Sequence, residues 1–414
     1  MGYFKKERIK TMKRSSGVRV LAESITVSND TRSTGMNNND LVIGSSGSGK
    51  TGGYVIPNIQ NIEGSIVVSD TKGQLYRNFS EELRQKGYEV KILDLVQPER
   101  SCVYNPLSHI RRYGDGSFYE KDILTLANSL VQCTASGDEP FWHFSARSYI
   151  AFLICYCLEN MPSAEQNMVT ITDLHNAMLK PNGDLAFIEW IKENPDSFAA
   201  RKYNELQSDV PAERTWACIK SFVNIALEPF EFKEAKHIFG SDDSIDLRDL
   251  GRKKMALFLN VSDTDRTFDA LVNIFYAQAL QVLVSEADSR QDGRLEVPVR
   301  IIMDDFAASA RIEDFDKIIS TIRSREISVS LILQSLTQLT GMYGKDAETI
   351  MDNCDHILYL GSQNLETAGY IGTRANKTPE KILYMPNDSA YFIEKGRQAE
   401  LVKKFVPYSS VRNR

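Results

Sequence analysis

A chain of 414 residues with 42% hydrophobic and 25% charged residues has the composition of a globular protein and is long enough for two domains. Its net charge of −6 does not indicate nucleic-acid binding, although a local basic channel can lie on an acidic body. Its six cysteines and five histidines lack the spacing of a zinc site. Without a secretory signal pattern or an apolar run of roughly 18–20 residues, we expect a cytoplasmic protein with reduced thiols.

The first residues are strongly basic. A basic arm of this kind can contact DNA, anionic lipid or an acidic partner, and the alternative is a solvated, frayed terminus. We assign residues 1–37 to this arm and to a lead-in strand region. Against the single acid Glu7, residues 1–19 carry Lys5, Lys6, Arg8, Lys10, Lys13, Arg14 and Arg19.

A complete G-x-x-x-x-G-K-[ST] phosphate loop follows an apolar run at 41–43 that predicts a buried strand, and residues 51–60 can begin a helix. Glycines let backbone N–H groups surround phosphate oxygens at a helix N-terminus. Lys50 would reach the β- and γ-phosphates, and the Thr51 hydroxyl would ligate Mg²⁺. The alternative, a flexible loop with a chance lysine, does not explain the order of strand, loop and helix. The motif consists of Gly44, Ser45, Ser46, Gly47, Ser48, Gly49, Lys50 and Thr51.

Residues 38–117 alternate between strand and helix patterns. Strands are expected at 65–69 and 90–93, with a helix at 75–86 that Gly87 ends. This rhythm is typical of a parallel sheet covered by helices on both faces. Asp70 and Lys72 follow the strand at 65–69, so we expect them to lie near a bound nucleotide, with Asp70 bonded to the water and metal network. The alternative is an ordinary turn.

Between residues 118 and 250 helical periodicity replaces the strands. Helices are expected at 121–131, 144–159, 171–178, 185–193 and 214–226. We interpret this region as an all-α domain.

Short apolar strands return in residues 251–414. They are expected at 254–261, 297–303, 327–333, 356–360 and 390–393, with helices at 267–285, 315–325 and 337–343. The fold class is therefore α/β, a RecA-like nucleotide-binding domain, formed by 38–117 and 251–414, with an inserted all-α domain.

Two adjacent acids, Asp304 and Asp305, end the apolar strand at 299–303. In a RecA-like sheet we expect this strand to lie beside the phosphate-loop strand. Asp304 would then reach Mg²⁺ directly or through water, and Asp305 would polarise the attacking water. The alternative is a solvated turn.

Three further polar residues lie near the strand at 327–333. Gln334 ends it and would face the crevice where ligands bind in open α/β sheets, sensing the γ-phosphate; the alternative is a helix cap. Arg323 and Arg325 precede the strand, and either could stabilise transition-state charge on a neighbouring subunit's ATP. An ordinary C-terminal helix cation is the alternative.

Together these elements resemble the type IV secretion coupling proteins, the TraG/TraD-like conjugative DNA-transfer ATPases. The resemblance covers roughly residues 20–395. It is carried by the phosphate loop, then D-x-K-G at Asp70–Gly73, N-P-L at Asn105–Leu107, F-W at Phe141-Trp142, the acidic motif Asp304-Asp305-Phe306-Ala307, the turn Arg323–Arg325, Q-S-x-x-Q-L at Gln334–Leu339, and Tyr343-Gly344.

The resemblance implies a motor that uses ATP and Mg²⁺ and assembles as a homo-hexamer around a DNA channel. Its helical domain would meet the relaxase or relaxosome, and the motor would deliver relaxase-bound single-stranded DNA to a conjugative type IV secretion channel. Arg323 or Arg325 would act on the neighbour's nucleotide.

Two departures from the family pattern affect the expected function. The family usually has glutamate where this chain has Asp305, so hydrolysis is expected to be slow unless a water bridges or the backbone compensates. Family members also usually carry N-terminal transmembrane helices. Here we expect no such segment, and recruitment to the inner face of the membrane by the basic arm or a separate membrane-anchoring subunit.

Two other functions stay open at this point. One is a DNA translocase of the FtsK/HerA type, which shares the motor core and moves double-stranded DNA. The other is a nucleotide-gated recruitment adaptor with little ATP turnover, which Asp305 keeps open.

Overall fold

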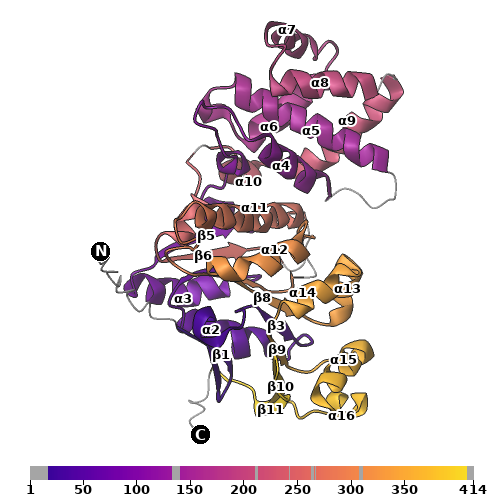
Figure 1. The fold of residues 1–414 in the computed structure, drawn as a ribbon. Helices are drawn as coiled ribbons and strands as arrows, with labels where there is room; N and C mark the ends of the chain where they lie inside the picture. The colour runs from indigo at the N-terminus through magenta and orange to yellow at the C-terminus, as the bar shows by residue number, and fades with distance from the viewer. Residues whose placement is uncertain are drawn as a thin grey trace, which may run out of the picture.

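The computed structural model describes residues 17–132, 140–209, 213–241, 243–262, 265, 267–306 and 311–407. The chain forms a helical unit, α4 to α10, and a sheet unit that holds the main sheet and the helices packed on it (Figure 1). Residues 1–16, which hold most of the predicted basic arm, lie outside the described residues, as does Ala307 of the predicted acidic motif.

The main sheet has nine strands within the described residues, in the order β11-β10-β9-β3-β8-β7-β4-β6-β5. The strands from β9 to β5 are parallel, and β10 and β11 form an antiparallel edge. A separate antiparallel hairpin, β1 and β2, precedes them. The strands are β1 Val18–Ala22, β2 Ile25–Ser28, β3 Asp40–Ile43, β4 Ser65–Ser69, β5 Glu89–Asp94, β6 Met255–Asn260, β7 Val299–Met303, β8 Ile327–Leu333, β9 His356–Tyr359, β10 Ser389–Glu394 and β11 Glu400–Lys403.

The helices divide between the two units. Those of the helical unit are α4 Glu120–Gln132, α5 Pro140–Asn160, α6 Met168–Met178, α7 Leu185–Glu193, α8 Phe198–Asp209, α9 Glu213–Leu227 and α10 Lys233–Phe239. The others are α1 Thr31–Thr34, α2 Ile56–Gln60, α3 Gln74–Gln85, α11 Asp269–Asp288, α12 Phe315–Thr321, α13 Leu336–Tyr343, α14 Asp346–Asp352, α15 Leu365–Ala375 and α16 Pro379–Leu383. Four short turns matter below: η1 Thr51–Val55, η3 Pro106–His109, η6 Leu247–Gly251 and η8 Ile322–Arg325.

Alternate side chains of the strands face two separate cores, as the pleat of a sheet requires. On one face Leu41 and Ile43 of β3 belong to a core that includes α11 to α15 and continues into the helical unit. On the other face Val42 packs in a core with η1, α2 and α3. Both faces of the parallel strands are therefore covered, which explains their continuous apolar runs.

The helical unit is built around α5. Nearly every side chain in the middle of α5, from 149 to 158, is fully buried, and α4, α6, α8 and α9 surround it (Figure 1). Among the described helices α11 has the length and hydropathy of a membrane span, and 67% of that stretch is buried within the protein. In the sheet unit α11 lies directly below α4 and α10 (Figure 1).

The predicted α/β fold with an inserted helical block is confirmed, because α4 to α10 all lie between β5 and β6 in the chain. The strands at 65–69 and 327–333 coincide with β4 and β8, and the helix at 185–193 coincides with α7. Sequence patterns missed α1, α8, α10, α14 to α16 and β11. The β1–β2 hairpin lies within the lead-in strand region expected in residues 1–37.

The expectation that the strand before Asp304 lies beside the phosphate-loop strand is wrong. That strand, β7, pairs with β4 and β8, whereas β3 pairs with β8 and β9. All seven residues of β8 are buried, so β8 suits an interior position, and the crossover through α12 returns it to the sheet next to β7. One strand therefore separates the two motifs.

A buried polar network lies at the amino ends of these strands. The Asp40 carboxylate accepts hydrogen bonds from Arg19 at 2.9 and 3.2 Å, from the Tyr54 hydroxyl at 2.5 Å and from Arg300 at 3.3 Å. Ser330 bonds both Tyr54 and Arg300. Burial alone would raise the pKa of Asp40, but the charges of Arg19 and Arg300 outweigh burial and lower it.

The assignment of Arg19 to a basic arm that contacts DNA, anionic lipid or an acidic partner, or else to a solvated terminus, is wrong. Its side chain is 1% exposed and also bonds Asn29 and Asn38. A guanidinium can only donate, so its 3.1 Å contact with Nδ1 of His356 is a hydrogen bond in the imidazole tautomer that carries its proton on Nε2. Burial in the same place lowers the pKa of His356.

Replacing Asp40 by asparagine is expected to lower the free energy of unfolding by about 3 kcal/mol, because two buried guanidinium groups lose their counter-charge. Urea unfolding followed by circular dichroism measures this change. The matched control is Glu81→Gln, which removes a carboxylate from an exposed pair with Arg84 on α3 and should change stability by less than about 0.5 kcal/mol. Equal effects of the two substitutions would contradict the central role of Asp40.

Candidate functional site

The phosphate loop is held between the carboxyl ends of β8 and β9. The Gly44 N–H donates to the Leu333 carbonyl at 3.0 Å, and the Ser45 N–H donates to the Gly361 carbonyl at 2.9 Å. Gly47 and Gly49 have φ values of 77° and 93°, which L side chains rarely adopt. The loop therefore has its bent shape before any ligand is present.

Lys50 lies across the loop. Its side chain is 9% exposed, and Nζ donates to the carbonyls of Gly44 at 2.8 Å and Ser45 at 3.3 Å. No carboxylate of the described residues forms an ion pair with Lys50. A buried ammonium held only by carbonyl oxygens favours an anion beside it.

The structure brings the loop and the two acids together across the end of β8. The Thr51 hydroxyl donates to Oδ2 of Asp304 at 3.3 Å, and the Asp305 N–H donates to Oδ1 of Asp304 at 3.0 Å. The Gln334 amide donates to Oδ1 of Asp305 at 3.2 Å. Four residues predicted as site residues therefore form one hydrogen-bonded chain.

The charge on Asp304 is poorly compensated. Burial and the carboxylate of Asp305 raise the pKa of Asp304 to about 6, and Lys50 offsets this only in part. Among the described residues no group of three His, Cys, Asp or Glu side chains could hold a metal ion. One carboxylate and one hydroxyl fit Mg²⁺, which usually takes its other ligands from water and substrate phosphates.

Asp70 and Lys72 occupy the turn between β4 and α3. The Asp70 carboxylate accepts from the Tyr76 N–H at 2.9 Å, and Lys72 is exposed, with its carbonyl accepting from Arg77. Two strands, β7 and β8, separate β4 from β3. The described contacts do not join these two residues to the phosphate loop, so their role at the nucleotide stays a prediction.

The two arginines differ in their surroundings. Arg325 forms a bidentate ion pair with Asp288, at 2.7 and 3.0 Å, and bonds the Thr321 carbonyl. Arg323 is exposed and has no ion pair with any described residue. Both precede β8, whose seven residues span about 20 Å. They therefore lie at the amino ends of the strands, whereas the phosphate loop of the same chain lies at the carboxyl ends.

Sequence reasoning missed the C-terminal segment that supports the loop. Nζ of Lys404 donates to the carbonyls of Ser48 at 3.0 Å and Leu360 at 2.8 Å, and burial lowers the pKa of Lys404. A Cβ on Gly52 would lie 3.3 Å from Pro407, so this position favours glycine. A single lysine far along the chain gave no motif that could indicate this contact.

The other motif residues have structural contacts. Asn105 caps η3 through the Leu107 N–H and donates to the Gln166 carbonyl of the helical unit. Phe306 stacks on Tyr343 with ring centroids 5.9 Å apart. The Gln334 N–H donates to the side chain of Gln338 at 3.0 Å. These contacts explain the spacing of the N-P-L and Q-S-x-x-Q-L motifs.

Comparison with known families assigns the chain to one of them. The model described as Type IV secretory system Conjugative DNA transfer matches residues 5–381. The chain belongs to this family. It is 24% identical over 340 residues to Protein VirD4 of Agrobacterium fabrum, covering 80% of this chain and 48% of that protein. It is 23% identical over 352 residues to the conjugal transfer protein TraG of Escherichia coli, and this match covers 80% of this chain and 54% of that protein. The chain thus spans about half the length of these relatives.

Solved structures share the fold. The plasmid coupling protein TrwB in complex with the ATP analogue ADPNP has a TM-score of 0.65 and 16% identity, covering 89% of this chain and 85% of that one. TrwB in complex with ADP and Mg²⁺ has a TM-score of 0.63 and 15% identity, and the match covers 90% of this chain and 86% of that one. The predicted RecA-like fold and the resemblance to coupling proteins are confirmed.

With no Mg²⁺ present, Asp304→Asn is expected to increase the free energy of unfolding at pH 7.5 by up to about 3 kcal/mol. The wild-type carboxyl has a pKa of about 6 when folded against 3.8 ordinarily, so its charge opposes folding above pH 6. Below pH 6 the wild type becomes protonated and the gain should shrink. Thermal unfolding at pH 7.5 and pH 5 measures this difference. A gain independent of pH would contradict the shifted pKa.

Proposed function

We propose that this chain is an ATP-binding motor of the coupling class, which delivers DNA to a conjugative type IV secretion channel. The observation that carries the proposal is the Thr51–Asp304 hydrogen bond. This contact joins a complete phosphate loop to an acid at the end of a different strand, as an Mg²⁺–nucleotide site requires. Membership of the conjugative DNA-transfer family supports the DNA-delivery role and favours it over an FtsK/HerA-type translocase.

The proposed nucleotide site uses the groups described above. The N–H groups of the loop surround the phosphates, and Lys50 exchanges the carbonyls of Gly44 and Ser45 for phosphate oxygens. Thr51 and Asp304 hold Mg²⁺, which when bound neutralises phosphate charge. TrwB, which shares the fold, has been solved with ADPNP and with ADP and Mg²⁺, and this supports ATP and Mg²⁺ as the ligands here.

Asp305 would orient the attacking water, and Gln334 would bond the γ-phosphate. Asp305 has the backbone conformation φ 50°, which is unusual for an L residue, and Gln334 holds its carboxylate. In this role Asp305 orients the attacking water, while Gln334 senses the γ-phosphate by hydrogen bonding to it. The shorter aspartate side chain supports slow hydrolysis.

Assembly would complete the site. Because Arg323 is exposed and lies at the far edge of the sheet from its own loop, it would contribute to a neighbour's ATP in a homo-hexamer. Arg325 is the weaker candidate, since Asp288 already holds it. We further propose that the helical unit meets the relaxase or relaxosome, and that the basic arm or a separate membrane-anchoring subunit recruits the chain to the inner face of the membrane.

Two substitutions separate binding from turnover. Lys50→Ala is expected to weaken ATP binding by at least tenfold and to abolish DNA transfer, because it removes the cation from the loop. Arg323→Ala should leave ATP affinity within twofold while lowering turnover of the assembled protein roughly 10³-fold. Binding is measured by calorimetry, turnover by phosphate release, and transfer by mating assays. Undiminished transfer with Lys50→Ala would refute the proposed function.

A second candidate function is a nucleotide-gated recruitment adaptor with little ATP turnover. The engagement of Asp305 by Gln334 favours it, because this carboxylate is shorter than glutamate and already bonded.

Asp305→Glu distinguishes the motor from the adaptor. If the short side chain limits hydrolysis, glutamate is expected to raise the rate of phosphate release by about tenfold, because its carboxylate reaches further toward the water. Asp305→Asn, which removes the charge at nearly constant size, is the matched control and should abolish release. A wild type that supports transfer while releasing no phosphate would favour the adaptor.

A further inference from the structure

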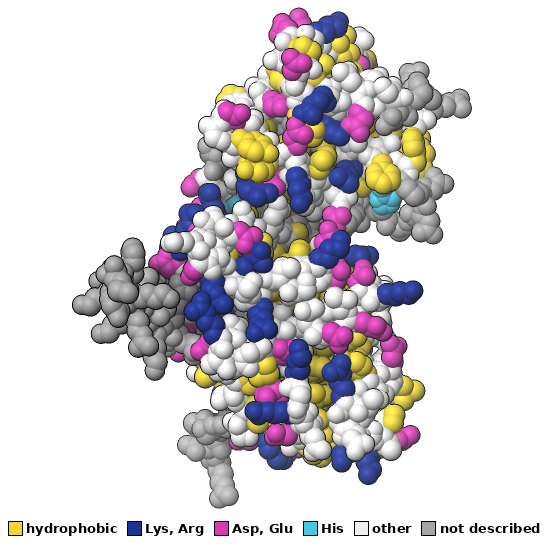
Figure 2. Space-filling model, viewed as in Figure 1, with side chains coloured by type: hydrophobic (Ala, Val, Ile, Leu, Met, Phe, Trp, Pro, Cys, Tyr) yellow, Lys and Arg dark blue, Asp and Glu magenta, His cyan; other side chains and the backbone are white. Residues whose placement is uncertain are grey.

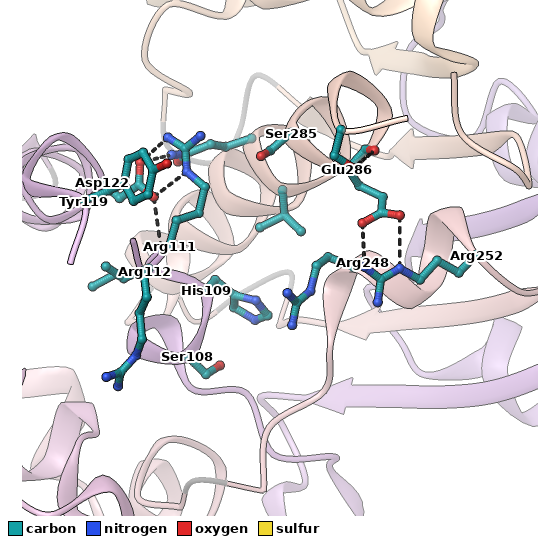
Figure 3. A pocket seen from close by; sticks show the side chains of 14 residues that line it. Ser108, His109, Arg111, Arg112, Tyr119, Asp122, Arg248, Arg252, Ser285 and Glu286 are labelled. Atoms are coloured by element: carbon teal, nitrogen blue, oxygen red, sulfur yellow. Dashed lines mark hydrogen bonds and ion pairs between the residues drawn. The ribbon is translucent and has the colours of Figure 1, made fainter. Parts of the chain in front are cut away.

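A pocket of about 550 Å³ lies where the helical unit meets the sheet unit. Its walls come from α4, from η3 and the loop after it, from η6 and from α11 (Figure 3). Each of these elements lies close to one of the two chain crossings between the units. A ligand in this pocket would therefore contact both units at once.

Arginines dominate the charged lining. Four of them, Arg111, Arg112, Arg248 and Arg252, share the pocket with two carboxylates, Asp122 and Glu286. On the face drawn in Figure 2, positive and negative side chains are interspersed over both units without a broad field of one sign.

Both carboxylates already accept hydrogen bonds from neighbouring side chains on both of their oxygens. Asp122 accepts from the backbone, Nε and Nη2 of Arg111 and from Gln281, at 2.7 to 3.1 Å. Glu286 accepts from Arg252 at 3.0 and 2.7 Å and from Arg290. These carboxylates are held as parts of the wall, so their repulsion of an incoming anion is reduced.

Two arginines keep donors for a ligand. Arg248 bonds Asp246 through Nε, and the end of its guanidinium points toward His109 (Figure 3). Arg112, at the exposed rim, bonds only the neutral Gln166 side chain among the described polar groups.

His109 supplies an independent sign of a ligand. Its Nε2 is buried and has no hydrogen-bond partner among the described residues, which is unfavourable for a buried polar atom. Burial lowers the pKa of His109 to about 4, so the ring is neutral, and in the tautomer with its proton on Nε2 it can donate one hydrogen bond to a ligand. A ligand oxygen placed between His109 and Arg248 would satisfy both groups.

We propose that this pocket binds a phosphate group, supplied either by the backbone of a nucleic-acid strand or by a free phosphorylated molecule. Phosphate oxygens match the planar donor fork of arginine, and the volume suits a ligand of nucleotide size. Bound phosphate would join η3 and the loop after it to η6, the two segments of the chain that lie beside the crossings between the units. This site is separate from the phosphate loop.

The test uses the full chain carrying Lys50→Ala, so that the phosphate loop does not contribute. Pyrophosphate binding is measured by calorimetry, and binding of fluorescein-labelled dT12 by anisotropy at several salt concentrations. The double substitution Arg112→Gln/Arg248→Gln is expected to weaken pyrophosphate binding at least tenfold. If the strand backbone is the source, its salt slope should also fall by about 1.4, for two lost phosphate contacts. Arg84→Gln on α3 removes one exposed charge elsewhere and serves as the control.

Each outcome decides the proposal. Weakened binding of both probes identifies a nucleic-acid backbone, and weakened binding of pyrophosphate alone identifies a free phosphorylated molecule. Wild-type affinity for both probes in the double variant overturns the proposal. His109→Asn is a second variant with unchanged charge; it should weaken pyrophosphate binding about threefold to fivefold, and circular dichroism verifies its fold. Because Lys50→Ala is present throughout, failure of the proposed motor function leaves this result unaffected.

Discussion

The sheet unit depends on one buried carboxylate, that of Asp40. It holds Arg19 from the hairpin, Tyr54 from the helix after the phosphate loop, and Arg300 from the strand that ends in the paired acids. Ser330 of the intervening strand closes the network. A buried charge is costly unless it is fully paired. These elements are therefore restricted to the one arrangement in which each of these donors bonds Asp40. The network thereby fixes the amino ends of β3 and β7 and the middle of β8 relative to one another.

This constraint reaches the candidate site through Tyr54. Tyr54 lies in η1, three residues after Thr51, and its hydroxyl is anchored to Asp40 and Ser330. On the outer side Lys404 holds the loop by the Ser48 carbonyl. The loop is thus held at its helix and at its backbone before any ligand binds. Such support reduces the ordering that binding must accomplish, and it explains why N–H groups rather than flexible side chains form most of the proposed phosphate cradle.

Local patterns predicted most of the fold and part of the site. The apolar runs of β4 and β8 and the phosphate loop carry their structure in consecutive residues, so periodicity and motif found them. Strand order is different, because every parallel strand has the same apolar pattern, and nothing local shows that β8 separates β3 from β7. Arg19 and Lys404 were missed for a related reason. A single cation in a sequence looks solvated, and its burial depends on partners such as Asp40 that lie far along the chain.

The strand that the sequence could not place gives the site its internal coupling. Because β8 lies between β3 and β7, Gln334, the residue directly after β8, follows the strand that separates the two motifs, and its amide holds the Asp305 carboxylate. The Gln334 N–H is in turn held by Gln338 of α13. In the proposed motor, Gln334 cannot bond a γ-phosphate through the same hydrogen that bonds Asp305. The second hydrogen of the Gln334 amide would bond the γ-phosphate while the first holds Asp305, so one side chain would link nucleotide sensing to the group that orients the attacking water.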